Sequence, residues 1–90
     1  MTTAMKTTKT VSVWLDTMSG EPQPAWIVSI DDMQEDGKAA YTRTLRTFEV
    51  ELDDDGIDPD NRSMRAEKTK AIEYAHELAE RKSLPVRVDD

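Results

Sequence analysis

The chain has 90 residues, 34% of them charged, a net charge of −7 at pH 7 and no cysteine. Its length limits it to one domain, and the lack of cysteine excludes disulfide scaffolds and thiolate metal sites. The acidic balance disfavours non-specific binding to nucleic acid or anionic membranes, no run approaches the roughly 20 apolar residues of a membrane span, and the N-terminus lacks a signal-peptide core, so we expect a soluble, cytoplasmic protein.

The N-terminal part of the chain is expected to consist of a tail followed by a strand. Residues 1–9 are rich in threonine and poor in large apolar side chains, which predicts a flexible tail before a single domain over residues 10–90. Residues 10–18 alternate as in a β-strand with one apolar face. The apolar positions are Val11, Val13 and Leu15. Trp14 lies on the other face, either as a cross-strand partner or as the edge of a binding surface.

A second strand is predicted over residues 25–33, after a connection that is rich in glycine and proline. Its start is apolar on both faces, which favours a central place in the sheet. The Asp36-Gly37 pair that follows indicates a hairpin turn, because glycine adopts the positive φ that such turns need.

Residues 39–52 form the third predicted strand, in which β-branched and aromatic side chains are common. Strict alternation directs one apolar set toward the core: Phe48, Val50 and Leu52. The same alternation places a second set on the opposite face: Tyr41, Arg43, Leu45, Thr47 and Glu49. Short connections join the three strands, which indicates an antiparallel meander.

Residues 64–82 carry the clearest pattern of the chain, an apolar stripe at helical spacing without glycine or proline. Two starts compete, a cap at Asp58 with Pro59 in the first turn, or a cap at Ser63. We favour a short turn at 58–61 and a helix from about residue 63. The alternation of residues 86–88 then suggests either a short last strand or an extended tail beside the sheet.

These elements define an α+β fold, a three-stranded antiparallel meander packed on one C-terminal α-helix, in the order βββα with or without a short final strand. The expected core is Val11, Val13, Leu15, Trp26, Val28, Ile30, Phe48, Val50, Leu52, Ile72, Ala75 and Leu78. The other face of the sheet is expected to be partly open. An open apolar patch commonly marks a protein interface, which includes a homodimer through that face: Trp14, Ile27, Tyr41 and Leu45.

Catalytic and metal chemistry find little support in the sequence. Residues 51–56 imitate the front of an EF-hand loop, but Asp58 stands where an apolar residue belongs, and Arg62 stands where a bidentate glutamate belongs. His76 is the sole histidine, without a recognisable nucleophile motif or a second metal ligand of its kind. We therefore predict no catalytic residue, no cofactor, no metal site and no enzymatic activity.

Acidic side chains are concentrated in loops, and this feature points to a protein partner. The candidate partner-binding residues are Asp31, Asp32, Glu35, Asp36, Asp53, Asp54, Asp55, Asp58 and Asp60. Such carboxylates can imitate the charge rows of a nucleic-acid backbone and occupy a basic groove on another protein, or they can serve solubility alone. In size and acidity the chain resembles small phage-borne anti-restriction and anti-CRISPR inhibitors.

The leading expectation is a non-catalytic acidic protein-binding module, in the form of a phage-type inhibitor or adaptor that acts on a basic nucleic-acid-handling protein. One alternative is a small nucleic-acid-binding domain that stacks bases on its open sheet face. The residues for that alternative are Trp14, Tyr41, Arg43 and Arg46. Direct binding of nucleic acid is disfavoured, because acidic loops repel phosphate. The remaining alternative is a small structural or interaction protein without such a target.

Overall fold

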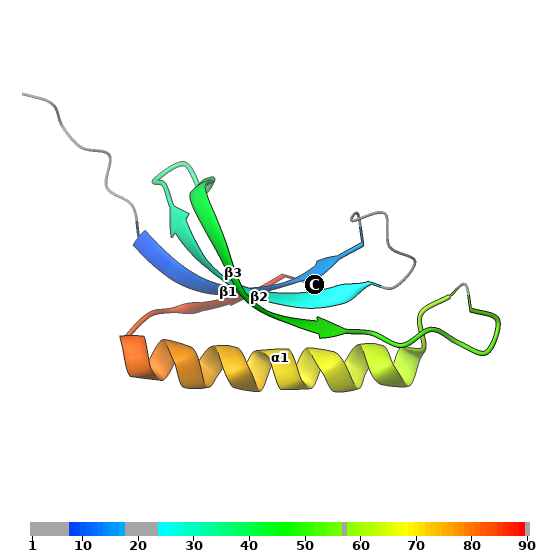
Figure 1. The fold of residues 1–90 in the computed structure, drawn as a ribbon. Helices are drawn as coiled ribbons and strands as arrows, with labels where there is room; N and C mark the ends of the chain where they lie inside the picture. The colour runs from blue at the N-terminus through cyan, green and yellow to red at the C-terminus, as the bar shows by residue number, and fades with distance from the viewer. Residues whose placement is uncertain (1–7, 18–23, 57, 90) are drawn as a thin grey trace, which may run out of the picture.

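The computed structural model of the protein describes residues 8–17, 24–56 and 58–89. Its elements are β1 (Thr8–Asp16), β2 (Ala25–Met33), β3 (Ala39–Glu49), α1 (Asn61–Lys82) and β4 (Val86–Val88). The strands form one sheet in the order β3-β2-β1-β4, and α1 lies along one face of it (Figure 1). This arrangement confirms the predicted α+β fold, including the short final strand. We call the sheet face that α1 covers the helix side.

The pairing of the strands follows the predicted meander. β1 and β2 are antiparallel, with Val13 opposite Val28, and β2 and β3 are antiparallel as well. The turn between β2 and β3 contains Gly37 at φ 85°, and the Gly37 N–H donates to the carbonyl oxygen of Gln34 at 3.0 Å. Glycine supplies the positive φ there without a steric cost. β4 pairs with β1 in parallel, so both β1 and β2 are internal strands.

The first strand starts two residues earlier than the sequence predicts. Thr8 pairs with Met33 and Lys9 with Asp32, so both belong to the sheet and not to a tail. The rest of the predicted tail, residues 1–7, lies outside the described residues, as does most of the predicted connection between the first two strands.

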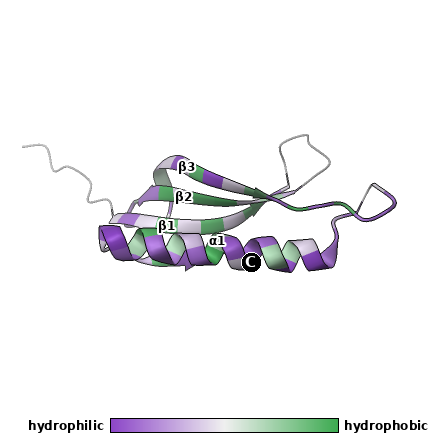
Figure 2. Cartoon of the chain, turned by 60° about the horizontal axis from the view of Figure 1, so that its bottom comes forward, coloured by the Kyte–Doolittle hydropathy of each residue, from purple (hydrophilic) through white to green (hydrophobic). Residues whose placement is uncertain are grey.

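The core lies between the helix and the strands. Its buried residues are Val11, Val13, Trp26, Val28, Phe48, Val50, Ala71, Ala75, Leu78 and Ala79. Leu15, Ile30 and Ile72 are partly buried against this cluster, and Leu52 is half-buried in a bridge to Pro59. Three of the four buried helix residues are alanines, which let the helix axis approach the sheet closely. Figure 2 accordingly shows a largely hydrophilic helix crossed by hydrophobic bands.

Aromatic contacts hold the helix against β2 and β3. The Trp26 indole N–H donates to the carbonyl oxygen of Met64 at 3.0 Å, which satisfies the polar atom of a nearly buried ring. Phe48 and Tyr74 form an edge-to-face pair with centroids 6.1 Å apart. The Arg46 guanidinium lies over both rings, 4.9 Å from Phe48 and 5.3 Å from Tyr74. These contacts fix the position of the helix on the sheet.

The helix begins at neither of the predicted caps. Asp60 is the N-cap, and its Oδ1 accepts a hydrogen bond from the Arg62 N–H at 2.8 Å. Ser63 already lies in the first turn, where its Oγ accepts the Glu51 N–H at 2.8 Å and ties the end of the loop to the helix. Aspartate is as good a cap as serine, so this tertiary hydrogen bond decides between them. The predicted start at residue 63 is therefore two residues late.

β3 does not keep the strict alternation that the sequence suggests. Val28 pairs with Arg46, but the next residue of β2, Ser29, pairs with Thr44, so Leu45 is the extra residue of a β-bulge. A bulge shifts the phase of every residue beyond it by one position. Tyr41 and Arg43 therefore lie on the helix side instead of the opposite face, and Leu45 packs partly against the core. The predicted assignment of these three residues to the open face is wrong.

Candidate functional site

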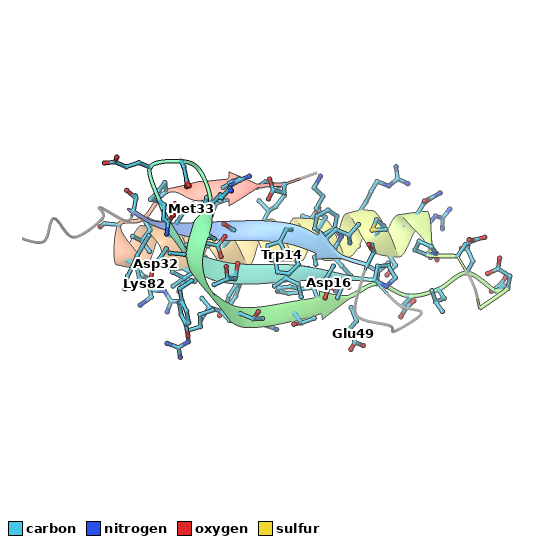
Figure 3. All side chains as sticks on the ribbon, turned by 90° about the horizontal axis from the view of Figure 1, so that it is seen from above. Trp14, Asp16, Asp32, Met33, Glu49 and Lys82 are labelled. Carbon is cyan, nitrogen blue, oxygen red and sulfur yellow. The ribbon has the colours of Figure 1, made fainter. Side chains whose placement is uncertain are left out.

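The face of the sheet that α1 leaves uncovered is the candidate functional site, and we call it the open face. Among the residues of β1–β3 on this face are Ser12, Trp14, Asp16, Ile27, Ser29, Asp31, Thr42, Thr44, Thr47 and Glu49, as the strand registers require. Figure 3 views this face from above, with Trp14 near its middle and Asp16 and Glu49 toward one end.

A chain of hydrogen bonds crosses the centre of the open face. The Trp14 indole N–H donates to Ser29 Oγ at 3.1 Å. The Ser29 hydroxyl donates in turn to Asp31 Oδ1 at 3.0 Å, and the Ser12 hydroxyl donates to Asp31 Oδ2 at 2.7 Å. The Asp31 carboxylate thus accepts two hydroxyl groups, and the Ser29 hydroxyl also accepts the indole N–H and positions the ring. Trp14 is held in one orientation without a contact to the helix.

The centre of the open face is sheltered from solvent although no helix covers it. Ser12 is 2% exposed, Ser29 0% and Ile27 6%, while Trp14 itself is half-buried. Trp14 lies directly opposite Ile27 in the register. The indole is therefore a cross-strand partner, which is one of the two roles that the sequence suggested for it. A preformed, partly exposed aromatic ring is a common anchor in protein interfaces.

Charge is segregated between the two faces of the sheet. In β1–β3 the basic residues Lys9, Arg43 and Arg46 all lie on the helix side, since each is in register with Asp32, Ile30 or Val28. Of the acidic residues in these strands, all but one lie on the open face: Asp16, Asp31 and Glu49. In the described part of the sheet this face has a single cation, Arg87 of β4, whose Nε is 3.3 Å from Asp89 Oδ1. The open face is therefore acidic around an aromatic centre.

The predicted acidic loops lie at opposite ends of the sheet and do not form one cluster. Glu35 and Asp36 belong to the turn between β2 and β3, whereas residues 53–60 connect β3 to α1 at the other end (Figure 1). Asp31 lies on the open face between them, and Asp32 lies on the helix side. Of the two predicted carboxylates in β2, the structure thus places Asp31 on the acidic open face and Asp32 on the opposite face.

Backbone hydrogen bonds join the described residues of the loop, 51–56 and 58–60. The Asp53 N–H donates to the Asp58 carbonyl at 2.7 Å, the Gly56 N–H donates to the Asp53 carbonyl at 2.8 Å, and Leu52 bridges to Pro59. The Asp55 carboxylate also accepts the Asp58 N–H at 3.1 Å. Asp53, Asp54, Asp55 and Asp58 are exposed, whereas Asp60 caps the helix and so has a structural role.

The surroundings of Asp53 in this loop disfavour the ionised form of its carboxyl. Desolvation raises the pKa of Asp53 above its ordinary value, and neighbouring negative charges raise it further: Asp60, Asp55, Asp58 and Asp54. A carboxyl with a higher pKa in the folded than in the unfolded chain opposes folding while it is ionised. That unfavourable contribution disappears as the pH falls below its pKa in the unfolded chain, about 3.9.

We expect Asp53→Asn to raise the melting temperature at pH 7 and to leave it unchanged near pH 3, because the substitution removes a charge whose desolvation and repulsion oppose folding only when the carboxyl is ionised. Added salt should shrink the difference, since the side chain is exposed. Glu73→Gln on the exposed surface of α1 controls for the loss of one negative charge elsewhere. A lower melting temperature of Asp53→Asn at pH 7 would contradict this assignment.

The described residues contain no group of side chains that could hold a metal ion. Within residues 8–17, 24–56 and 58–89, no three histidine, cysteine or carboxylate side chains are grouped as metal ligands would be. Arg62, at the twelfth place of the loop that imitates an EF-hand, lies in the first turn of α1. His76 is exposed on the same helix. In these ranges, moreover, no helix is long and apolar enough to cross a membrane.

The residues that were expected to form a nucleic-acid surface do not share one face. Trp14 lies on the open face, whereas Tyr41 and Arg43 lie on the helix side because of the bulge at Leu45. Arg46 is on the helix side as well, because it alternates in phase with Phe48. Arg46 is also engaged with Phe48 and Tyr74. These four residues therefore do not form the stacking surface that the sequence suggested, and the Trp14 ring shares its face of the sheet with the carboxylates of Asp16, Asp31 and Glu49.

Sequence reasoning missed the polar centre of the open face. Ser12, Ser29 and Asp31 are in phase with Trp14 and Ile27 on two strands whose antiparallel pairing was predicted, so their proximity could have been derived from the register. Comparison with protein-family models, with curated proteins and with solved structures gave no match.

Proposed function

We propose that this protein is a non-catalytic acidic protein-binding module, and that its open face binds a basic surface of a partner protein. The observation that carries the proposal is the segregation of charge in β1–β3, with all basic strand residues on the helix side and carboxylates on the open face. Complementary potentials accelerate encounter with a basic partner and exclude an acidic one. A nucleic-acid-handling protein in the cytoplasm has such a surface, and an inhibitor or adaptor of phage type is the form that we propose.

The centre and the border of the open face have different roles in this proposal. Trp14, which is half-buried in the free protein, supplies the aromatic anchor of the interface, since the Ser29 and Asp31 side chains already fix its orientation. Asp16 and Glu49 supply charges at the border, where pairing affects association rate and salt dependence more than affinity. The exposed carboxylates of residues 53–58 extend the acidic surface beyond one end of the sheet.

A binding role without catalysis agrees with the burial and the hydrogen bonds of the serine hydroxyls on this face. Ser12 and Ser29 are almost fully buried, and both hydroxyls donate to Asp31. A catalytic serine needs a base that accepts its proton and an open approach for substrate. Here the hydroxyls instead stabilise a carboxylate and an indole.

The test uses a deca-arginine peptide as a basic probe. We expect Asp16→Asn with Glu49→Gln to weaken its binding by about three- to tenfold at low salt, because two screened surface charges are lost. Glu73→Gln with Glu77→Gln changes the net charge equally on the exposed surface of α1 and should weaken binding less. Equal weakening by both pairs would show that net charge alone attracts the probe. Isothermal titration calorimetry at two salt concentrations gives the comparison.

Mixed-sequence single-stranded DNA in a filter-binding assay provides the opposite test. The wild type should not be retained at roughly physiological salt, because the carboxylates around Trp14 repel phosphate. Tight binding that is weakened by Trp14→Ala would instead favour the nucleic-acid alternative.

A further inference from the structure

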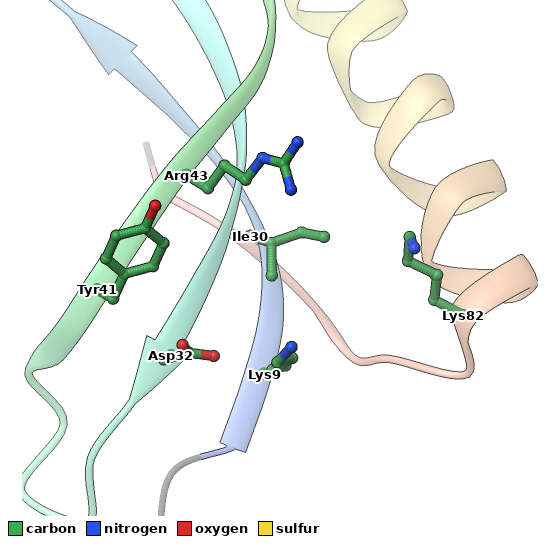
Figure 4. Close-up of a pocket in the computed structure, with 6 residues that line it drawn as sticks. All are labelled: Lys9, Ile30, Asp32, Tyr41, Arg43 and Lys82. Carbon is green, nitrogen blue, oxygen red and sulfur yellow. The ribbon is translucent and has the colours of Figure 1, made fainter.

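A second charged surface lies on the helix side, at the end of the sheet where α1 terminates. It is a pocket with a volume of about 250 Å³, lined by Lys9, Ile30, Asp32, Tyr41, Arg43 and Lys82. We call it the anion pocket. Its residues come from β1, β2, β3 and α1, and Figure 4 shows Arg43 extending from β3 toward the helix that carries Lys82.

The charge balance of the anion pocket is opposite to that of the whole chain. It has three cations and one carboxylate, in a protein with a net charge of −7. In the part of the chain that the structure describes, none of these four charged side chains forms a hydrogen bond or an ion pair, although Lys9 and Asp32 are opposite each other in the register. The cations are thus left available for a ligand.

The β-bulge at Leu45 creates this surface. Without the extra residue, the alternation of β3 would direct Tyr41 and Arg43 to the open face. With it, the Tyr41 hydroxyl and the Arg43 guanidinium are on the same side of the sheet as Lys9 and Lys82. Bulges occur frequently beside binding sites, where they redirect a side chain.

We propose that the anion pocket binds a small phosphate-bearing molecule. Arginine can present two parallel N–H donors to a phosphate, lysine acts as a point charge, and the tyrosine hydroxyl adds a further donor. Donors that line one pocket from two strands and a helix suit the several oxygens of a tetrahedral phosphate better than the two oxygens of a carboxylate. Ile30 offers an apolar contact for the rest of the molecule.

The carboxylate of Asp32 distinguishes this pocket from a surface that is only basic, because its removal should strengthen phosphate binding. The Asp32 carboxylate lines the same pocket and repels a phosphate dianion. Asp32→Asn should therefore tighten phosphate binding several-fold, whereas loss of a cation should weaken it. This site is separate from the open face, so its failure and the failure of the proposed protein-binding function are distinguishable.

The experiment titrates inorganic phosphate, and separately ribose 5-phosphate, into ¹⁵N-labelled protein at constant ionic strength, with chloride as the reference anion. We expect saturable shifts of the Asp32, Tyr41 and Arg43 amide signals, which are independent of the open-face signals. Arg43→Gln with Lys82→Gln should weaken binding about tenfold or more, the value of a lost charge-assisted hydrogen bond. Arg62→Gln with Arg65→Gln, at the other end of α1, removes equal charge and should leave the affinity unchanged.

Tighter binding of ribose 5-phosphate than of inorganic phosphate would show that the pocket also contacts the organic part of the ligand, and equal binding would limit recognition to the phosphate group. Absence of saturable shifts with either compound would overturn the proposal. Equal weakening by the two double variants, or weaker binding by Asp32→Asn, would overturn it as well.

Discussion

Leu78→Ala is expected to destabilise the protein by about 2–4 kcal/mol, because it removes the largest buried side chain that α1 contributes to the core and leaves a cavity. The neighbouring buried residues of the helix are alanines, which cannot extend to fill that cavity. For a domain of this size, each kilocalorie per mole shifts the melting temperature by roughly 4–8 °C. Chemical denaturation and thermal melts should therefore both detect the change.

Glu77→Ala is the matched control, since Glu77 precedes Leu78 in the sequence but is exposed on the outer surface of the helix. Its substitution should change the free energy of unfolding by less than about 0.5 kcal/mol. Equal losses for the two variants would mean that α1 presents a different face to the sheet.

Asp31→Ala is expected to cost about 2–4 kcal/mol, a large effect for a polar residue on the open face. The change removes the acceptor of two hydroxyl groups on serines that are 2% and 0% exposed, Ser12 and Ser29. A buried donor that loses its partner costs roughly 1–3 kcal/mol. The Trp14 indole, positioned through Ser29, should also lose its fixed orientation, which tryptophan fluorescence anisotropy can report.

Two further variants separate this network from a general effect of charge. Glu49→Ala removes an exposed carboxylate from the same face and should change stability by less than about 0.5 kcal/mol. Asp31→Asn keeps an acceptor oxygen and should lose less stability than Asp31→Ala. An Asp31→Ala variant as stable as Glu49→Ala would show that water satisfies the serine hydroxyls.

Much of the fold could be predicted because β1 and β2 keep one side-chain phase throughout. Val11 and Val13 of β1 and Val28 of β2 are buried where the alternation puts them. The apolar stripe of the helix was likewise sufficient to place Leu78 in the core. Periodicity is reliable where no residue is inserted in a strand.

β3 could not be predicted in the same way, because its bulge depends on pairing with β2. No glycine or proline marks the extra residue Leu45 within β3. A single insertion reversed the faces of Tyr41 and Arg43, which removed them from the expected stacking surface and placed them in the anion pocket. The helix start was missed for a similar reason, since the hydrogen bond between Ser63 and Glu51 joins residues far apart in sequence.

The chain contains two tryptophans, and the structure places one on each side of the sheet. The Trp14 indole N–H donates to Ser29 on the open face, and the Trp26 indole N–H donates to Met64 under the helix. Their two signals in a ¹H–¹⁵N correlation spectrum therefore report separately on the two sides.

The most direct test of the open face as the binding surface is to follow these two signals while deca-arginine is added at low salt. The Trp14 signal should shift saturably and the Trp26 signal should stay in place, with the shift weakened by Asp16→Asn and Glu49→Gln. A shift of the Trp26 signal while that of Trp14 stays unchanged would contradict the proposed function.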